Sequence, residues 1–69
     1  MPAISVQAWL TSLGLDRYWV AFDDEGYDVW PIVFKAAGGD GVKLDRFFAK
    51  HKVRPAHADE IRDELAKLM

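Results

Sequence analysis

Residues 6–33 read VQAWLTSLGLDRYWVAFDDEGYDVWPIV, and the order of apolar residues and glycines in this stretch decides the fold. Apolar residues first recur at i, i+3, i+4 and i+7, the spacing of one helix face: Val6, Trp9, Leu10 and Leu13. Ser5 is a natural N-cap for this helix. Gly14 provides a residue for the left-handed position that ends a helix, and Leu15 provides the apolar contact beyond it.

A second helix is expected to begin at Asp16 and to end at Gly26. We predict Asp16 as its N-cap, with Leu15 and Val20 packed against each other as a hydrophobic staple. Its buried face is expected to carry two aromatic residues four positions apart: Tyr18 and Phe22.

A short third helix is predicted after Asp28, which we interpret as its N-cap. Pro31 lies in the first turn, where its missing N–H breaks no helical hydrogen bond. The residues expected to face the core are Val29, Ile32 and Val33. Trp30 is then expected to point toward solvent, about 100° around the helix from Val29. Glycines at 38, 39 and 41 predict a loop after this helix.

Two more helices are predicted in the remaining sequence. One is expected over residues 42–50, with an apolar face of Leu44, Phe47 and Phe48. The last begins at Pro55 and has an apolar stripe of Ile61, Leu65 and Leu68. We therefore predict an all-α, compact five-helix bundle that forms a single domain over residues 1–69. The last helix has no visible stop signal, which suggests that the chain is a fragment.

Composition restricts the possible functions. The chain has 69 residues, 51% of them hydrophobic, no cysteine and a formal net charge of −2. A chain of this length forms one core and leaves little room for a deep pocket, so we predict no enzyme activity and no cofactor. The sequence has neither a signal-peptide pattern nor an apolar run long enough to cross a bilayer. These features predict a cytoplasmic protein that does not bind membranes.

Three sequence patterns resemble ligand sites but lack essential residues. His51 and His57 are six apart with no further ligand at zinc spacing, so we predict no metal site. If Gly26 is taken as the invariant glycine of a calcium loop, Ala21 and Ile32 occupy ligand positions. The glycines at 38, 39 and 41 lack the Gly-Lys-Ser/Thr ending of a phosphate-binding loop.

The order of these features resembles the sterile alpha motif (SAM) domain, a five-helix interaction module of about this length. The motifs that carry the resemblance are Trp9-Leu10, Leu13-Gly14-Leu15, Tyr18, Phe22 and Glu25-Gly26-Tyr27-Asp28. The second half is less similar, because His51-Lys52-Val53 stands where the family usually has a Leu-Gly-Ile-like turn. The resemblance implies a protein-binding domain that joins an acidic mid-loop surface to a basic end-helix surface, head to tail.

Charge is sorted along the chain in the way that this implied contact requires. Residues 16–40 contain six acidic and two basic residues, whereas residues 43–54 contain five basic residues and one acidic residue. The candidate mid-loop residues are Asp23, Asp24, Glu25, Asp28, Trp30 and Asp40. The candidate end-helix residues are Lys52, Arg54, His57 and Arg62. We expect association with copies of the same or a similar domain, which would cluster an attached protein.

Aromatic residues suggest where such a contact is anchored. The chain has nine (Trp 3, Tyr 2, Phe 4), more than a core of this size needs, so we expect some at the surface. Trp30 is the predicted interface anchor and Trp19 a possible further one. The alternative function is RNA binding through a basic patch near the start of the last helix. Its candidate residues are Lys50, Lys52, Arg54 and Arg62.

Overall fold

The computed structural model describes residues 2–69, and Met1 of the predicted domain lies outside this range. It contains five α-helices: α1 (Val6–Ser12), α2 (Trp19–Asp24), α3 (Trp30–Ala37), α4 (Val42–Lys50) and α5 (Pro55–Leu68). A 3-10 turn, η1 (Asp16–Tyr18), leads into α2. The described residues contain no strand, which confirms the prediction of an all-α fold with five helices.

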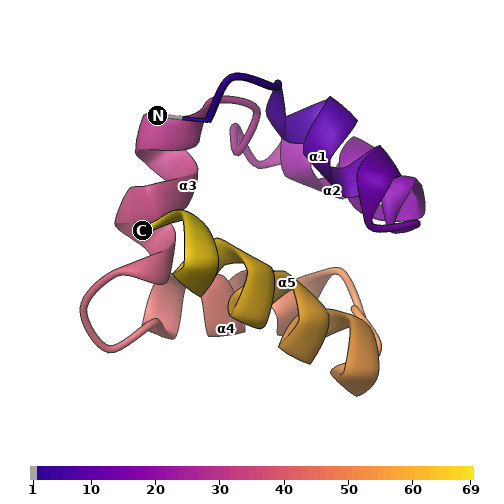
Figure 1. The fold of residues 1–69 in the computed structure, drawn as a ribbon. Coiled ribbons are helices and arrows are strands. Elements are labelled where there is room, and N and C mark those ends of the chain that lie inside the picture. Colours follow the sequence, from indigo (N-terminus) through magenta and orange to yellow (C-terminus); the bar gives the residue numbers. More distant parts are fainter. Residues whose placement is uncertain (1) are drawn as a thin grey trace.

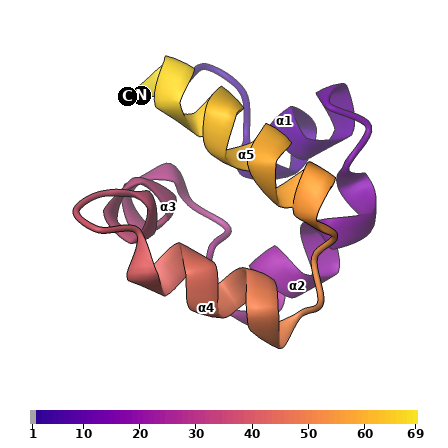
Figure 2. The ribbon, with the colours of Figure 1, turned by 90° about the horizontal axis from the view of Figure 1, so that it is seen from below.

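Two pairs of helices face each other, and α3 connects them. In Figure 1, α1 and α2 lie above α4 and α5, and α3 runs along one side between the pairs. The C-terminal turn of α5 lies beside α3 in Figures 1 and 2, and α3 also contacts α4. The Cα radius of gyration is 10.7 Å. A compact chain of this length is expected to have a value of about 11 Å. No helix among residues 2–69 has the length and apolar character needed to cross a membrane.

Local sequence signals fix several helix ends as predicted. The Ser5 hydroxyl accepts a hydrogen bond from the Ala8 N–H at 3.1 Å and so caps α1. The fourth helix has the predicted bounds of 42 and 50, and α5 begins at Pro55 as expected. Ile61 and Leu65 of α5 are buried, but Leu68 is exposed, so the predicted apolar stripe is shorter by one turn.

The predicted start of the second helix is wrong. Asp16 opens η1 rather than an α-helix, and no side-chain hydrogen bond caps either η1 or α2. Val20 is 74% exposed, which excludes the predicted staple with Leu15. The 3-10 turn winds more tightly than an α-helix and changes the direction of the residues after it. Tyr18 and Phe22 are nevertheless buried, as predicted.

The predicted orientation of the third helix is also wrong. Val29 is the extended N-cap of α3, with no side-chain cap, so Asp28 does not cap the helix. The buried residues of α3 are Trp30, Val33 and Ala36. Val29 and Ile32, which were expected in the core, are each 45% exposed. The sequence VWPIVF offers two apolar stripes at helical spacing, and the stripe that includes the larger indole is the buried one.

Trp30 therefore belongs to the core and is not a surface anchor. Only 5% of its surface is exposed, and its ring meets that of Trp9 edge to face with the centroids 5.3 Å apart. The Trp30 ring also stacks on Phe34. Its indole N–H donates to the Ile4 carbonyl at 2.7 Å, which satisfies the polar atom of this buried side chain.

A second aromatic cluster joins α2 to α4. The Phe22 and Phe47 rings lie edge to face, 4.8 Å apart, and Tyr27 contacts both of them. All nine aromatic residues are buried or partly buried against the core, so the expectation of exposed aromatics is wrong. A domain this small has few other large side chains with which to fill the space between short helices.

We predict that Trp30→Ala unfolds the domain or lowers its stability by about 3–5 kcal/mol, the usual cost of truncating a buried aromatic residue. Circular dichroism melting and urea titration measure this loss. The control is Val20→Ala, which removes an exposed side chain and should change stability by less than about 0.5 kcal/mol. An unchanged melting temperature for Trp30→Ala would contradict the burial of this indole.

Candidate interaction surfaces

Three helices end in the same hydrogen-bonded turn, and the third of these turns is unusual. After α1, the Leu15 N–H donates to the Leu10 carbonyl at 2.9 Å, around Gly14 with φ 72°. After α2, the Tyr27 N–H donates to the Phe22 carbonyl at 2.7 Å. Gly26 is the left-handed residue of that second turn, with φ 82°. Both turns are Schellman motifs, which favour glycine because a Cβ is strained at positive φ.

After α4 the same motif contains a lysine in place of the glycine. The Val53 N–H donates to the Phe48 carbonyl at 2.9 Å, and the Lys52 N–H donates to the Ala49 carbonyl at 3.3 Å. Lys52 has φ 54° and is the one non-glycine residue in positive φ among those described. A left-handed conformation typically costs an ordinary residue about 1–2 kcal/mol. The chain therefore holds a lysine where glycine would be less strained.

The basic turn between α4 and α5 consists of Lys52 and Arg54. Both residues are exposed, and neither side chain forms an ion pair within the described part of the chain. Two charged donors are therefore presented to solvent on a short, hydrogen-bonded connection. These two residues remain candidates for the predicted end-helix surface.

His57 is half-buried and bonded within the molecule. Its Nδ1 lies 2.5 Å from the Tyr18 hydroxyl, and the two rings meet edge to face. The same hydroxyl accepts the Arg54 backbone N–H at 3.5 Å. Tyr18 thus joins η1 to the first turn of α5. His57 was predicted to lie on the end-helix surface, and in the described structure it is half-buried and its ring contacts Tyr18 of η1.

Arg62 was also predicted on the end-helix surface, and its side chain packs against α4. Its guanidinium group pairs with the Asp45 carboxylate and lies over the Phe48 ring, 5.2 Å from the centroid. A guanidinium over an aromatic face is favourable, and the ion pair fixes its direction. Arg62 therefore contributes to the contact between α4 and α5 and is less available to a partner than predicted.

Glu25, a predicted mid-loop residue, also has partners within the molecule. Its Oε1 lies 2.5 Å from the Lys50 Nζ and 2.9 Å from the His51 Nε2. The hydrogen bond to Lys50, followed by that to His51, holds the pKa of the Glu25 carboxyl below its usual value of 4.5. The same pair raises the pKa of Lys50 above 10.5. The acidic and basic segments of the sequence thus meet within one molecule at this point.

What remains of the mid-loop surface is an exposed acidic and apolar region, which we call the acidic face: Asp23, Asp24, Asp28, Val29 and Ile32. The two apolar residues of the acidic face flank buried Trp30 in sequence and are each 45% exposed. Val29 follows directly on Asp28, and Ile32 lies in the first turn of α3. The acidic face therefore combines charge with apolar area, although not through the predicted tryptophan.

Two other predicted interface residues lie elsewhere. Asp40 is exposed in the loop after α3, at the opposite end of that helix from Asp28. Its Oδ1 accepts the Val42 N–H at 3.1 Å, so it supports the start of α4. Trp19 is half-buried and packs against the core cluster, which leaves only part of its ring at the surface.

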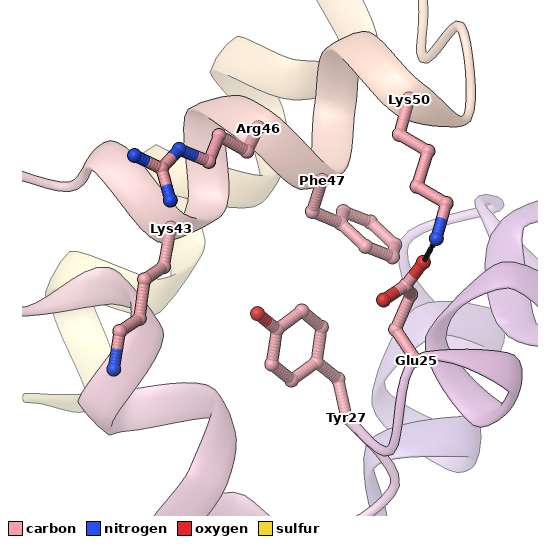
Figure 3. Close-up of a pocket in the computed structure, with 6 residues that line it drawn as sticks. All are labelled: Glu25, Tyr27, Lys43, Arg46, Phe47 and Lys50. Atoms are coloured by element: carbon pink, nitrogen blue, oxygen red, sulfur yellow. Dashed lines mark ion pairs between the residues drawn. The ribbon is translucent and has the colours of Figure 1, made fainter.

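A pocket of about 220 Å³, not predicted from the sequence, lies between the α2–α3 loop and α4. Figure 3 shows the six residues that line it: Glu25, Tyr27, Lys43, Arg46, Phe47 and Lys50. The sequence signal was present in the basic residues of α4, which are spaced i, i+3 and i+7 and so share one helix face. Tyr27 comes from a distant segment and was not predictable by spacing.

The basic patch named for RNA binding is not continuous. Lys50 is paired with Glu25 and Arg62 with Asp45. Only Lys52 and Arg54 of the four candidates remain without an ion pair in the described residues. Binding to a phosphate backbone depends on several unpaired basic residues, so this arrangement does not favour the RNA alternative.

Comparison of the chain with family models, with curated proteins and with solved structures found no match.

We predict that Lys52→Gly stabilises the domain by about 0.5–1 kcal/mol and raises its melting temperature by a few degrees, because it removes the strain of positive φ. The matched control is Gly14→Lys, which places lysine in the same motif after α1, where an added Cβ meets no atom within 4 Å. It should destabilise the domain by a similar amount. Thermal melting checks both, and a destabilised Lys52→Gly would show that Lys52 makes a compensating contact.

The Glu25 ion pair predicts a specific pH dependence. Because folding lowers the pKa of Glu25, its stabilising effect is complete above about pH 4.5 and is lost as the pH falls through the lower folded pKa. Glu25→Gln should therefore lose less stability than the original chain between pH 4.5 and pH 3. The control is Asp23→Asn, at an exposed carboxylate without an ion pair among residues 2–69. Melting curves across this range measure the difference, and parallel curves for Glu25→Gln and the original chain would refute the assignment.

Proposed function

We propose that this chain is a SAM-like protein-interaction domain that associates head to tail with copies of itself or of a similar domain. The acidic face of one copy contacts the basic turn of the next. The domain thereby clusters whatever protein it is attached to and is itself not an enzyme. A contact of this kind uses two different surfaces, so it leaves one of each unoccupied and extends into an open filament.

The observation that carries the proposal is the left-handed Lys52. At the two equivalent turns, Gly14 and Gly26 occupy this position without strain. A strained, exposed lysine at the third turn favours a role for this charge other than folding, because strained residues concentrate at functional sites. A cation fixed on a turn, with Arg54 two residues on, is a suitable acceptor for a carboxylate-rich surface.

Charge and apolar area on the acidic face support the same reading. Three exposed aspartates supply the opposite charge, and Val29 and Ile32 supply apolar surface that a partner would remove from water. Charge steers the two surfaces together, whereas affinity depends on what is desolvated at the centre of the contact. In this proposal the apolar anchor of the contact is exposed Ile32 and not buried Trp30.

Complementary variants test the proposal. Asp23→Lys/Asp28→Lys removes the acidic face, and Lys52→Glu/Arg54→Glu removes the basic turn. Each variant alone should be monomeric, whereas their equimolar mixture should form a dimer through the one intact surface on each. Light scattering after size-exclusion chromatography measures the mass, which for the original chain should rise with concentration and fall with added salt.

Two further variants separate association from folding. Ile32→Ala should weaken association while leaving the melting temperature nearly unchanged, and Val20→Ala, at another exposed apolar position, should affect neither. Lys52→Gly should weaken association even though it stabilises the fold. An original chain that remains monomeric at millimolar concentration and low salt would overturn the proposal.

A further inference from the structure

The pocket beside α4 holds an uncompensated cluster of positive charge. Lys43, Arg46 and Lys50 line the pocket from one face of this helix, and the Lys50 ammonium reaches Glu25 in the α2–α3 loop (Figure 3). Of these three, only Lys50 has a carboxylate partner, Glu25 at 2.5 Å. In the described part of the chain, neither Lys43 nor Arg46 forms an ion pair or a side-chain hydrogen bond.

This arrangement opposes folding rather than assisting it. Like charges three or four residues apart on a helix repel each other. Lys43 is also the second residue of α4, near the positive end of the helix dipole, where a cation is unfavourable. A structural role for the cluster would require a compensating acid, and the single carboxylate that lines the pocket, Glu25, is engaged by Lys50 and His51.

Hydrogen-bond donors from two parts of the chain, α4 and the α2–α3 loop, line the pocket. The Tyr27 hydroxyl points toward the side of the pocket lined by Lys43 and Arg46, as Figure 3 shows, and no hydrogen bond within the described chain occupies it. The Arg46 guanidinium offers a planar pair of N–H donors that matches two oxygens of one anion. The Tyr27 and Phe47 rings, 5.3 Å apart, form an aromatic wall beside these donors.

The net charge of the lining selects among anions. Three basic side chains and one carboxylate give a formal charge of +2. A phosphate monoester carries about −1.5 to −2 charges at neutral pH, so it neutralises the pocket, whereas a carboxylate or a sulfate ester leaves an excess positive charge. The aromatic wall beside the donors accommodates the organic group that bears the phosphate.

We propose that this pocket binds the phosphate monoester of a phosphorylated protein side chain, with Arg46, Lys43 and the Tyr27 hydroxyl as donors and Lys50 held in place by Glu25. None of the six residues that line the pocket belongs to the acidic face or the basic turn, and Glu25 and Tyr27 adjoin Asp24 and Asp28 in sequence. Phosphate binding at this pocket can therefore be tested separately from head-to-tail association. Binding supplies the anion that the ligand-free helix lacks, so occupancy should also stabilise the fold.

Nuclear magnetic resonance titration of the 69-residue chain with O-phospho-L-tyrosine and O-phospho-L-serine tests the proposal. We expect saturable shifts at Tyr27, Lys43 and Arg46 for both, and a rise in melting temperature at saturation. O-sulfo-L-tyrosine has a similar shape but a sulfate group with one negative charge, and its affinity should be lower than that of phosphotyrosine by about tenfold or more. Sulfotyrosine binding as tight as phosphotyrosine would overturn the requirement for a dianion.

Substitutions of single lining residues test which side chains bind the phosphate. Arg46→Ala should weaken phosphotyrosine binding about tenfold or more, the usual effect of removing a charge-assisted donor pair, and Arg46→Lys should be intermediate. Lys43→Ala should also weaken binding while raising the melting temperature of the ligand-free domain. The control is Lys35→Ala, which removes an exposed lysine of α3 outside the pocket and should leave binding unchanged.

Inorganic phosphate and vesicles distinguish other ligands. Equal or tighter binding of inorganic phosphate would define a free-anion site and overturn the proposal of a phosphorylated side chain. Arg46-dependent binding to vesicles that contain an anionic phospholipid, without binding of either phosphoamino acid, would overturn it in favour of a membrane surface. Absence of saturable binding to either phosphoamino acid would overturn it outright.

Discussion

The edge-to-face contact between Trp9 and Trp30 is the interaction on which the rest of the structure depends. It joins α1 to α3, and α3 in turn contacts both α4 and α5. Once the indole of Trp30 is buried, Ile32 lies outside the core, since it occupies another direction around the same short helix, and the extended N-cap residue Val29 is also exposed. The position of one large side chain therefore determines which residues the domain presents to solvent.

Features that depend on neighbouring residues were predictable from the sequence. The Ser5 cap, the left-handed Gly14 and the bounds of α4 each follow from a few adjacent residues whose propensities agree. The orientation of α3 was not predictable in this way, because VWPIVF places two apolar stripes at helical spacing. Only the shape of the surrounding core selects between them, and that shape is set by residues far away in the sequence.

The candidate surfaces likewise combine features that neighbouring residues determine with contacts that depend on residues distant in sequence. Exposure of Lys52, Arg54 and the aspartates at the end of α2 follows from their place beside helix ends. The contacts that engage Glu25, His57 and Arg62 join residues 26, 39 and 17 positions apart, and spacing along one helix carries no information about them. Sorting of charge along the sequence predicted two surfaces, but three of the residues assigned to them, Glu25, His57 and Arg62, form contacts between helices within the molecule.

The packing of two buried tryptophans against each other also gives the domain a spectroscopic signal of its folded core. Indoles held at a fixed angle give near-ultraviolet circular dichroism that is lost when side-chain packing is lost, even where helices persist. Trp9 and Trp30 are both 5% exposed, and neither belongs to the acidic face or the basic turn. The signal of this pair therefore follows the ordered core, so a loose, still helical state is distinguishable from a native domain without any added label.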